Sequence, residues 1–217
     1  MRMFCEDRDL LSIEPVIFIG GGNVGQQLIG GSDGVLSGTT FTSTSSDFES
    51  AGVDAGMVLC TYTDNPAEGS AVEIVTVDSA TALTVSVLRG DVEDAPIPPP
   101  SGSSLGFYVR TFAAQIGTVS ETLAEKLRQV EEATGISKAE YADSQQLRTT
   151  AVSGSLSSVF VSRADNATDR DANWVKAEHY RQQFDRQQLQ LRLVVDSDSD
   201  GTAEQTRTLG NIILRRL

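Results

Sequence analysis

The amino-acid sequence predicts an α+β fold: a helical bundle of about three main helices, an inserted small β-sheet or barrel module, and a C-terminal β-hairpin or extended tail. Two patterns support this prediction. Between residues 38 and 87, runs rich in threonine and valine alternate with turn sequences, as short strands do. From Phe112 onward, apolar residues recur at helical spacing. We therefore expect a helical core with its tail at residues 1–35 and 105–217, the β module at 36–93, and a proline-rich connector at 94–104.

The clearest helix begins at Phe112. Six apolar residues follow one another in steps of three or four, which places all of them on one stripe. They are Phe112, Ile116, Val119, Leu123, Leu127 and Val130. Gly135 is expected to end this helix.

A short helix is predicted near the N-terminus, at residues 7–14. Leu10, Leu11 and Ile13 are its expected packing residues, and Pro15 ends it because the residue before a proline avoids helical geometry.

Two more helices and a hairpin are expected in the second half of the chain. One helix begins at the capping box Ser137–Glu140, and the next begins near Thr168 or Asp169. Leu191 still has helical spacing, but residues 188–194 also alternate between polar and apolar, so they either continue the third helix or form a strand. In the second case we expect a hairpin with residues 210–217, and otherwise an extended tail.

The β module is predicted from three alternating runs. These are Val58–Tyr62, Ala71–Val77 and Leu83–Val87, with a turn at Asp78–Ala80 between the last two. Gly106–Phe112 is expected to return as one further strand of the same module.

The charge balance excludes several classes of protein. The 217 residues include 17 Lys+Arg and 30 Asp+Glu, a net charge of −13. A protein that grips nucleic acid by releasing counterions needs clustered cations, which this chain lacks. The same deficit argues against attachment to anionic membranes, and no apolar run approaches the ~18 residues of a membrane helix. We therefore expect neither DNA gripping nor membrane binding.

The N-terminal residues and the cysteines indicate the compartment. Glu6, Asp7 and Asp9 fall where a signal peptide would be apolar, so we expect none. Cys5 and Cys60 are interpreted as reduced thiols in the cytoplasm rather than as one disulfide.

A glycine motif follows the apolar run Val16–Ile19. Gly20, Gly22 and Gly25 satisfy G-x-G-x-x-G, the pattern of a dinucleotide-binding loop. That loop requires a helix directly after it, whose N-terminal amides bind the phosphates. Only Gln26–Ile29 precede the next glycine, which is too short for such a helix. We interpret the run as a loop or glycine turn and predict no cofactor.

A second motif resembles a calcium loop. Asp196, Asp198, Asp200 and Gly201 match four positions of the EF-hand, where alternate carboxylates converge on the ion. The position that requires a bidentate glutamate is Arg207. Two interpretations stay open: a weak divalent-cation site, or an acidic turn that binds no metal. We favour the acidic turn.

Catalytic patterns are sparse. His179 is the single histidine, and it stands beside Glu178 and Tyr180 on the third long helix, where a structural or solvent-exposed role is expected. The sequence contains no G-x-S-x-G, C-x-x-C or H-E-x-x-H motif. We therefore predict that the protein is not an enzyme.

Cations gather at the C-terminal end of the chain. Arg207, Arg215 and Arg216 lie in an otherwise acidic protein. They indicate either a strand with one polar face or a tail that docks on an acidic partner, for example by strand addition.

Several segments of the β module look like those of a known group of proteins. They are Gly38–Phe41, Asp47–Phe48, Ala51–Val58, Glu73–Thr81 and Leu83–Ser86. The module resembles those of phage neck and tail-completion proteins, and the helical part, with Trp174-x-x-Ala177-x-x-Tyr180, is similar to the core of connector subunits. The order of parts thus resembles the head–tail connector (adaptor or neck) proteins of tailed bacteriophages and related prophages or gene-transfer particles.

This resemblance implies a structural virion protein. It implies a homo-oligomeric ring, a dodecamer in that family, which is made in the bacterial host cytoplasm and assembled at the head–tail junction under the portal. Implied partners are the portal protein, the next neck or tail-completion protein, and passing DNA that is not specifically bound. The tail would bind the portal through Ile212, Ile213, Leu214, Arg215, Arg216 and Leu217. Acidity agrees with this role, because a conduit that lets DNA slide should repel phosphate.

A rival hypothesis is a calcium-dependent binding or adhesion module. It would use the Asp196–Asp200 loop to hold the ion and the β module as its recognition face.

Overall fold

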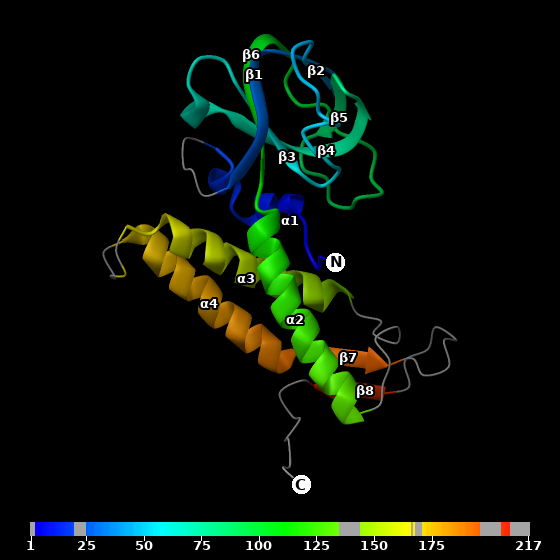
Figure 1. Cartoon of the computed structure of the whole chain (residues 1–217), viewed down its shortest axis with the longest axis vertical. Coiled ribbons are helices and arrows are strands. Elements are labelled where there is room, and N and C mark those ends of the chain that lie inside the picture. The colour runs from blue at the N-terminus through cyan, green and yellow to red at the C-terminus, as the bar shows by residue number, and fades with distance from the viewer. Residues whose placement is uncertain are drawn as a thin grey trace. The chain divides into compact units, whose positions relative to one another are not determined.

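The computed structural model describes residues 3–19, 25–134, 144–165, 167, 171–195 and 205–208. The chain divides into two compact units (Figure 1). One comprises Glu6–Ala113 and is called the barrel unit; the other comprises Met1–Cys5 with Ala114–Leu217 and is called the helical unit.

The barrel unit contains six antiparallel strands in the closed order β1-β2-β5-β4-β3-β6 (Figure 1). They are β1 (Gln26–Ser37), β2 (Thr40–Thr42), β3 (Val58–Tyr62), β4 (Ser70–Ser79), β5 (Ala82–Ser86) and β6 (Gly102–Thr111). Closure depends on β6, which pairs with β1 on one side and with β3 on the other. Each strand therefore has two neighbours, and the barrel presents no open edge for strand addition.

The predicted fold class was wrong. We expected a helical bundle with a small inserted β-sheet or barrel module, whereas the described residues form a closed six-stranded barrel plus four helices. The difference arises mainly from β1, most of which precedes the expected 36–93 module and which pairs with β6 from Gln26↔Thr111 to Leu36↔Gly102. The further strand expected at Gly106–Phe112 lies largely within β6. Glycine is normally depleted in strands, so the glycine-rich β1 gave no strand pattern.

The glycines of β1 make room for aromatic rings. A Cβ at Gly31 would lie 2.8 Å from the Phe107 ring, and one at Gly34 would lie 2.9 Å from the Phe41 ring. With those volumes free, the rings of Phe41 and Phe107 meet edge to face with their centroids 5.0 Å apart. The glycine-rich stretch is therefore part of the core packing of the barrel.

All six strands, together with the β2–β3 connection, contribute to the barrel core. Its buried apolar side chains are Leu36, Phe41, Phe48, Val53, Leu59, Val72, Ile74, Leu83, Val85, Leu105, Phe107 and Val109. Removal of this apolar surface from water is the main stabilising term for the unit.

The predicted N-terminal helix is confirmed as α1 (Asp7–Ile13), followed by the 3-10 turn η1 (Pro15–Ile17). Leu10 and Leu11 are buried as expected, but Ile13 is exposed.

The N-terminal segment also covers the outer face of β3 and β6. The Cys60 thiol and the Tyr108 hydroxyl both donate to the Phe18 carbonyl, at 3.2 and 2.9 Å. Residues of β3 are thus buried on both faces, which explains their nearly continuous apolar sequence.

The helical unit is formed by α2 (Ala113–Thr134), α3 (Ser144–Arg163) and α4 (Ala172–Gln190) with the hairpin β7 (Arg192–Val195) and β8 (Gln205–Thr208) (Figure 1). The predicted stripe is confirmed for its first five members, Phe112, Ile116, Val119, Leu123 and Leu127, all of which are buried.

The other helix boundaries differ modestly from expectation. The capping box Ser137–Glu140 lies outside the described residues. Helix α4 begins a few residues after Asp169, because the Asp171 carboxylate accepts the N–H groups of Asn173 and Trp174 and so caps the helix. In the hairpin, Arg192–Val195 pairs with Gln205–Thr208; the predicted partner, residues 210–217, is outside the described part of the chain.

Helices α3 and α4 approach closely because α3 is rich in small residues. A Cβ at Gly154 would lie 2.8 Å from both Phe184 of α4 and Val119 of α2. One turn further on, the Ser157 hydroxyl donates to the Ala177 carbonyl at 3.0 Å. Small side chains thus set the contact distance between the three helices.

Candidate functional site

The motifs found in the sequence are only partly described by the structure. Gly20–Val24, Asp196–Gly201 and Ile212–Leu217 lie outside the described residues. Gly25 directly precedes the strand β1. The glycine motif therefore leads into a strand and not into the helix that a dinucleotide loop needs.

The single histidine and the two thiols occupy ordinary structural positions. His179 is exposed on α4, with its ring edge-on to Tyr180 at a centroid distance of 5.3 Å. Cys5 and Cys60 are buried free thiols, and burial raises the pKa of Cys60 to about 12. A thiol with so high a pKa is a poor nucleophile at neutral pH.

Within the residues that the structure describes, no group of three or more His, Cys, Asp or Glu side chains is arranged to hold a metal ion. Among the helices described, none is long and apolar enough to cross a membrane.

The most distinctive feature is the division of charge between the two units. The 30 acidic residues divide equally, 15 in each unit, whereas the 17 basic residues divide as 3 in the barrel unit and 14 in the helical unit. The net charges are therefore −12 for the barrel unit and −1 for the helical unit. Nearly all of the acidity of the chain belongs to the barrel unit.

All three cations of the barrel unit are buried. Arg8, Arg89 and Arg110 are 5%, 8% and 4% exposed. Twelve carboxylates of the same unit reach solvent: Glu6, Glu14, Asp33, Asp47, Glu49, Asp54, Asp64, Glu68, Asp78, Asp91, Glu93 and Asp94. The surface of this unit is consequently acidic without any compensating cation.

Two of these arginines are held by one buried carboxylate, that of Glu73 on β4. The Arg8 Nε lies 2.8 Å from one Glu73 oxygen, and the Arg89 side chain and backbone N–H both bind the other. Glu73 is fully buried. The single negative charge of Glu73 is shared by two buried guanidinium groups, and the Arg8 Nη1 and the Glu73 oxygen that faces Arg8 are buried without a hydrogen-bond partner. The opposite charges within this cluster offset part of the cost of burying them.

The third arginine is also committed to internal contacts. The Arg110 guanidinium lies over the Tyr108 ring, 4.8 Å from its centroid, and donates to the Phe18 carbonyl at 3.4 Å. A desolvated cation over an aromatic face is stabilised by the ring quadrupole.

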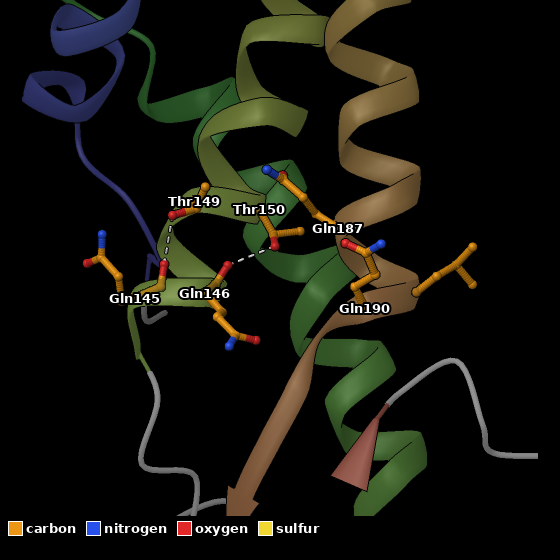
Figure 2. Close-up of a pocket in the computed structure, with 7 residues that line it drawn as sticks. Gln145, Gln146, Thr149, Thr150, Gln187 and Gln190 are labelled. Atoms are coloured by element: carbon orange, nitrogen blue, oxygen red, sulfur yellow. Dashed lines mark hydrogen bonds between the residues drawn. The ribbon is translucent and has the colours of Figure 1, made fainter. Parts of the chain in front are cut away.

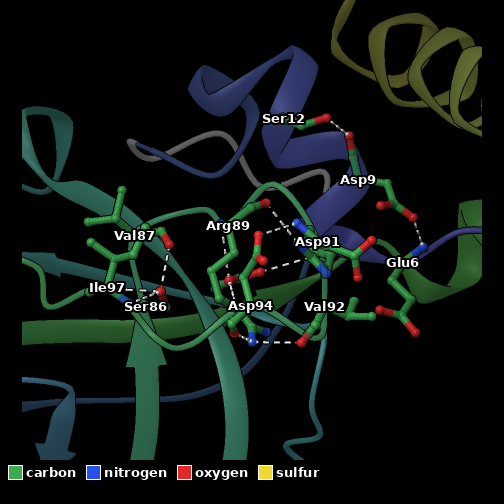
Figure 3. A network of polar contacts seen from close by, with 12 residues as sticks. Glu6, Asp9, Ser12, Ser86, Val87, Arg89, Asp91, Val92, Asp94 and Ile97 are labelled. Atoms are coloured by element: carbon green, nitrogen blue, oxygen red, sulfur yellow. Dashed lines mark hydrogen bonds and ion pairs between the residues drawn. The ribbon is translucent and has the colours of Figure 1, made fainter.

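Arg89 also orders the segment that follows β5, residues 87–97 (Figure 3). One guanidinium nitrogen of Arg89 donates to the carbonyls of Val92 and Asp94, both at 2.7 Å. The Arg89 carbonyl in turn accepts from Arg8 at 3.0 Å. Burying this arginine therefore fixes the shape of an exposed acidic loop.

Asp7 is the buried carboxyl with the clearest pKa shift. It accepts the Phe112 N–H at 2.8 Å. Burial raises its pKa to about 6, although hydrogen bonds from Thr111 and Phe112 oppose that rise. Asp7 thus titrates close to neutral pH while it holds the backbone at the end of β6.

A groove of about 540 Å³ lies between α3 and α4 (Figure 2). Its described lining is uncharged: Gln145, Gln146, Thr149, Thr150, Gln187, Leu189 and Gln190. The Thr149 and Thr150 hydroxyls already donate to the carbonyls of Gln145 and Gln146 within α3, at 3.0 and 2.8 Å. This lining offers amides for polar contacts and no ionisable group for acid–base catalysis.

Neither the Glu73 cluster nor the uneven division of charge between the two units was predicted from sequence patterns. The uneven distribution of charge could have been counted from the sequence, because residues 6–113 contain three arginines and no lysine. The burial of Arg8 and Arg89 could not be predicted, since their pairing with Glu73 depends on three segments that meet only in the folded barrel.

Comparison with known proteins identifies no relative: no family model, no curated protein and no solved structure matches this chain. Function must therefore be inferred from the residues themselves.

Proposed function

We propose that the chain is a structural subunit of the head–tail connector of a tailed bacteriophage or a related particle. In this proposal, copies made in the host cytoplasm form a ring, twelve-fold by the resemblance described above, that lies under the portal and forms part of the DNA conduit. The observation that carries the proposal is the barrel surface, where twelve carboxylates face solvent and every cation is buried.

The physical reason is the charge of DNA. Duplex DNA carries a phosphate charge about every 1.7 Å of its axis, and exposed lysine or arginine would bind it by releasing counterions. A surface with only carboxylates repels the phosphates and leaves DNA free to move. The three buried arginines stabilise the barrel without offering any contact to DNA.

The remaining features are compatible with an assembly protein. The closed barrel has no free strand edge, so any contact that the barrel unit makes with another subunit must use its side chains or loops. We assign portal binding to the tail residues Ile212–Leu217, which combine apolar side chains with Arg215 and Arg216.

The proposal is tested by mixing the full-length chain with portal rings from the same genome and sedimenting the rings. We expect the chain to co-sediment and to add a ring of density in electron micrographs. A chain that stays in the supernatant in excess of portal contradicts the proposal.

A truncated chain without residues 210–217 tests the assignment of the tail. Its circular dichroism should match that of the full chain, while co-sedimentation with portal should be lost. Undiminished co-sedimentation of this truncation would refute the portal-binding role of the tail.

DNA binding supplies an independent check. At low salt, where electrostatic attraction is strongest, an electrophoretic mobility assay should show no shift of duplex DNA by the full chain. A shift that is removed by salt would mean that cations of the helical unit grip DNA, in conflict with a sliding conduit.

A further inference from the structure

Several solvent-accessible carboxylates of the barrel unit are held by uncharged donors. The Asp33 carboxylate on β1 accepts the Ser43 hydroxyl at 2.7 Å and the Thr44 hydroxyl at 3.1 Å. It also accepts the Ser45 N–H at 3.0 Å. These bonds, that from Ser43 above all, hold the pKa of Asp33 well below its usual range. Hydroxyl and amide donors bring no positive charge, so they keep the carboxylate ionised without neutralising it.

The same arrangement recurs at two further acidic residues of this unit. The Asp47 carboxylate accepts the N–H and the hydroxyl of Ser50, at 2.9 and 2.7 Å. The Asp78 carboxylate accepts the hydroxyls of Thr76 and Thr84, at 2.7 and 2.8 Å. These bonds, like those of Asp33, fix a negative charge at the surface and leave it in place.

The helical unit balances its charges in a different way. Its carboxylates include Glu125, paired with Arg128, and Glu178, paired with Arg181, and its net charge is −1. The barrel unit has a net charge of −12, and all of its cations are buried. Its exposed carboxylates therefore repel one another through the solvent, and repulsion of this kind destabilises a compact fold.

We propose that the barrel unit depends on dissolved salt for its stability, because ions from the solvent screen the repulsion between its exposed carboxylates. Screening acts over the Debye length, which is about 30 Å at 0.01 M salt and about 10 Å at 0.1 M. A compact unit of about 100 residues has a radius of gyration of about 13 Å. Carboxylates throughout the barrel unit thus repel one another at 0.01 M salt, whereas at 0.1 M and above only close neighbours do.

The stabilising agent is the diffuse ion atmosphere and not a bound ion. In the described part of the chain, no group of three or more acidic, histidine or cysteine side chains is arranged to hold a metal ion. Screening depends on ionic strength and not on which monovalent salt supplies it. NaCl and KCl should therefore stabilise the barrel unit equally. This inference is independent of the connector proposal, since it concerns the stability of one unit and no partner.

Hydrogen–deuterium exchange of the full-length chain tests the inference, because it reports on each unit separately. When NaCl is lowered from 0.5 M to 0.01 M, the amides of β3 and β4 should exchange about tenfold faster or more, since the loss of screening favours opening of the barrel. The amides of α3 and α4 should change much less. Equal changes in the two units, or no change in β3 and β4, would overturn the inference.

A triple variant connects this effect to the carboxylates of the barrel unit. Glu49→Gln, Asp64→Asn and Glu93→Gln together remove three exposed charges from it. In 0.01 M NaCl, the amides of β3 and β4 should exchange more slowly in this variant than in wild type. The difference between low and high salt should shrink accordingly, because fewer charges remain to be screened.

A matched triple variant of the helical unit is the control. Glu121→Gln, Glu125→Gln and Asp185→Asn remove three exposed charges there and should leave the salt response of β3 and β4 nearly unchanged. Thermal melts in 0.5 M NaCl check that both variants fold. A barrel variant with the salt response of wild type, or a helical variant that loses it, would contradict the inference. Different responses to NaCl and KCl at equal concentration would also contradict it, since they would indicate a bound ion.

Discussion

The barrel unit and the helical unit keep their folds by different means. In the barrel, large rings such as Phe41, Phe48 and Phe107 fill the interior, and Glu73 joins two buried arginines. In the helical unit, the approach of α2, α3 and α4 depends on a missing side chain at Gly154. Both units are therefore expected to be sensitive to added volume, at Gly31 and Gly34 in the barrel and at Gly154 in the helical unit. Only the barrel unit is in addition expected to be sensitive to the loss of the Glu73 charge.

The two units also differ in what they present to solvent. The barrel unit uses its cations internally and exposes only carboxylates, while the helical unit exposes both signs, as in the Glu178–Arg181 and Glu125–Arg128 pairs. This difference bears on the proposed function, because a surface that exposes only carboxylates repels the phosphates of DNA.

The largest expected effect comes from removing the charge of Glu73. Glu73→Gln leaves Arg8 and Arg89 buried without a counter-charge, which should lower the free energy of unfolding by about 3–5 kcal/mol. Urea denaturation followed by circular dichroism measures the change. Glu68→Gln, at an exposed position of the same unit, is the matched control and should change stability by less than about 0.5 kcal/mol. Equal effects of the two variants would mean that the buried cluster has no special role.

The second-largest loss of stability is expected from added volume between the helices of the helical unit. Gly154→Val places a branched side chain against Phe184 and Val119, where even a Cβ would lie 2.8 Å away. We expect a loss of about 1–3 kcal/mol from overpacking, measured in the same denaturation experiment.

Gly117 on α2 is the control for volume. No atom lies within 4 Å of the Cβ that alanine would add there. Gly117→Ala should therefore stabilise the protein by about 0.5–1 kcal/mol through helix propensity. A stabilising Gly154→Val would contradict the close approach of the three helices.

The stability of the barrel unit is also expected to depend on pH, through the buried carboxyl group of Asp7. Because the folded-state pKa of Asp7 is raised from 3.8 to about 6, the native state holds this proton more tightly than the unfolded state. The contribution of Asp7 to stability is therefore greatest below pH 4, falls as the pH rises to 6, and is constant above that.

Asp7→Asn tests this pH dependence. The amide oxygen can still accept the Phe112 N–H, but the titration is removed. Relative to wild type, the variant should gain stability as the pH rises from 4 to 6, by on the order of 3 kcal/mol in total. Asp54→Asn, an exposed control, should give no such slope. A parallel pH profile of wild type and Asp7→Asn would show that Asp7 does not titrate in this window.

The smallest effect is expected for an exposed ion pair of the helical unit. Arg128 holds the pKa of Glu125 at about 2, yet both side chains are half exposed and screened by water. Glu125→Gln should therefore leave the unfolding midpoint within experimental error. A clear loss of stability would mean that surface pairing supports the helical unit as internal pairing supports the barrel.

Sequence patterns predicted the helices better than the barrel. The stripe from Phe112 to Leu127 could be predicted from spacing alone, because the residues on the buried face of a helix recur every three or four positions. The strand β1 was hidden, because Gly31 and Gly34 are explained by Phe107 and Phe41, which are distant in sequence. A local pattern cannot show why a strand needs glycine when the reason is a ring from another strand.

The acidic surface of the barrel unit, like the fold, could be predicted only in part from the sequence. By itself, the sequence determined the net charge of −13, the small number of barrel cations, and the positions of the long helices. Only the tertiary structure decided that β1 and β6 close the barrel and that Glu73 takes Arg8 and Arg89 out of solvent. Composition and periodicity are properties of neighbouring residues, whereas barrel closure and charge burial depend on segments that meet only when the chain folds.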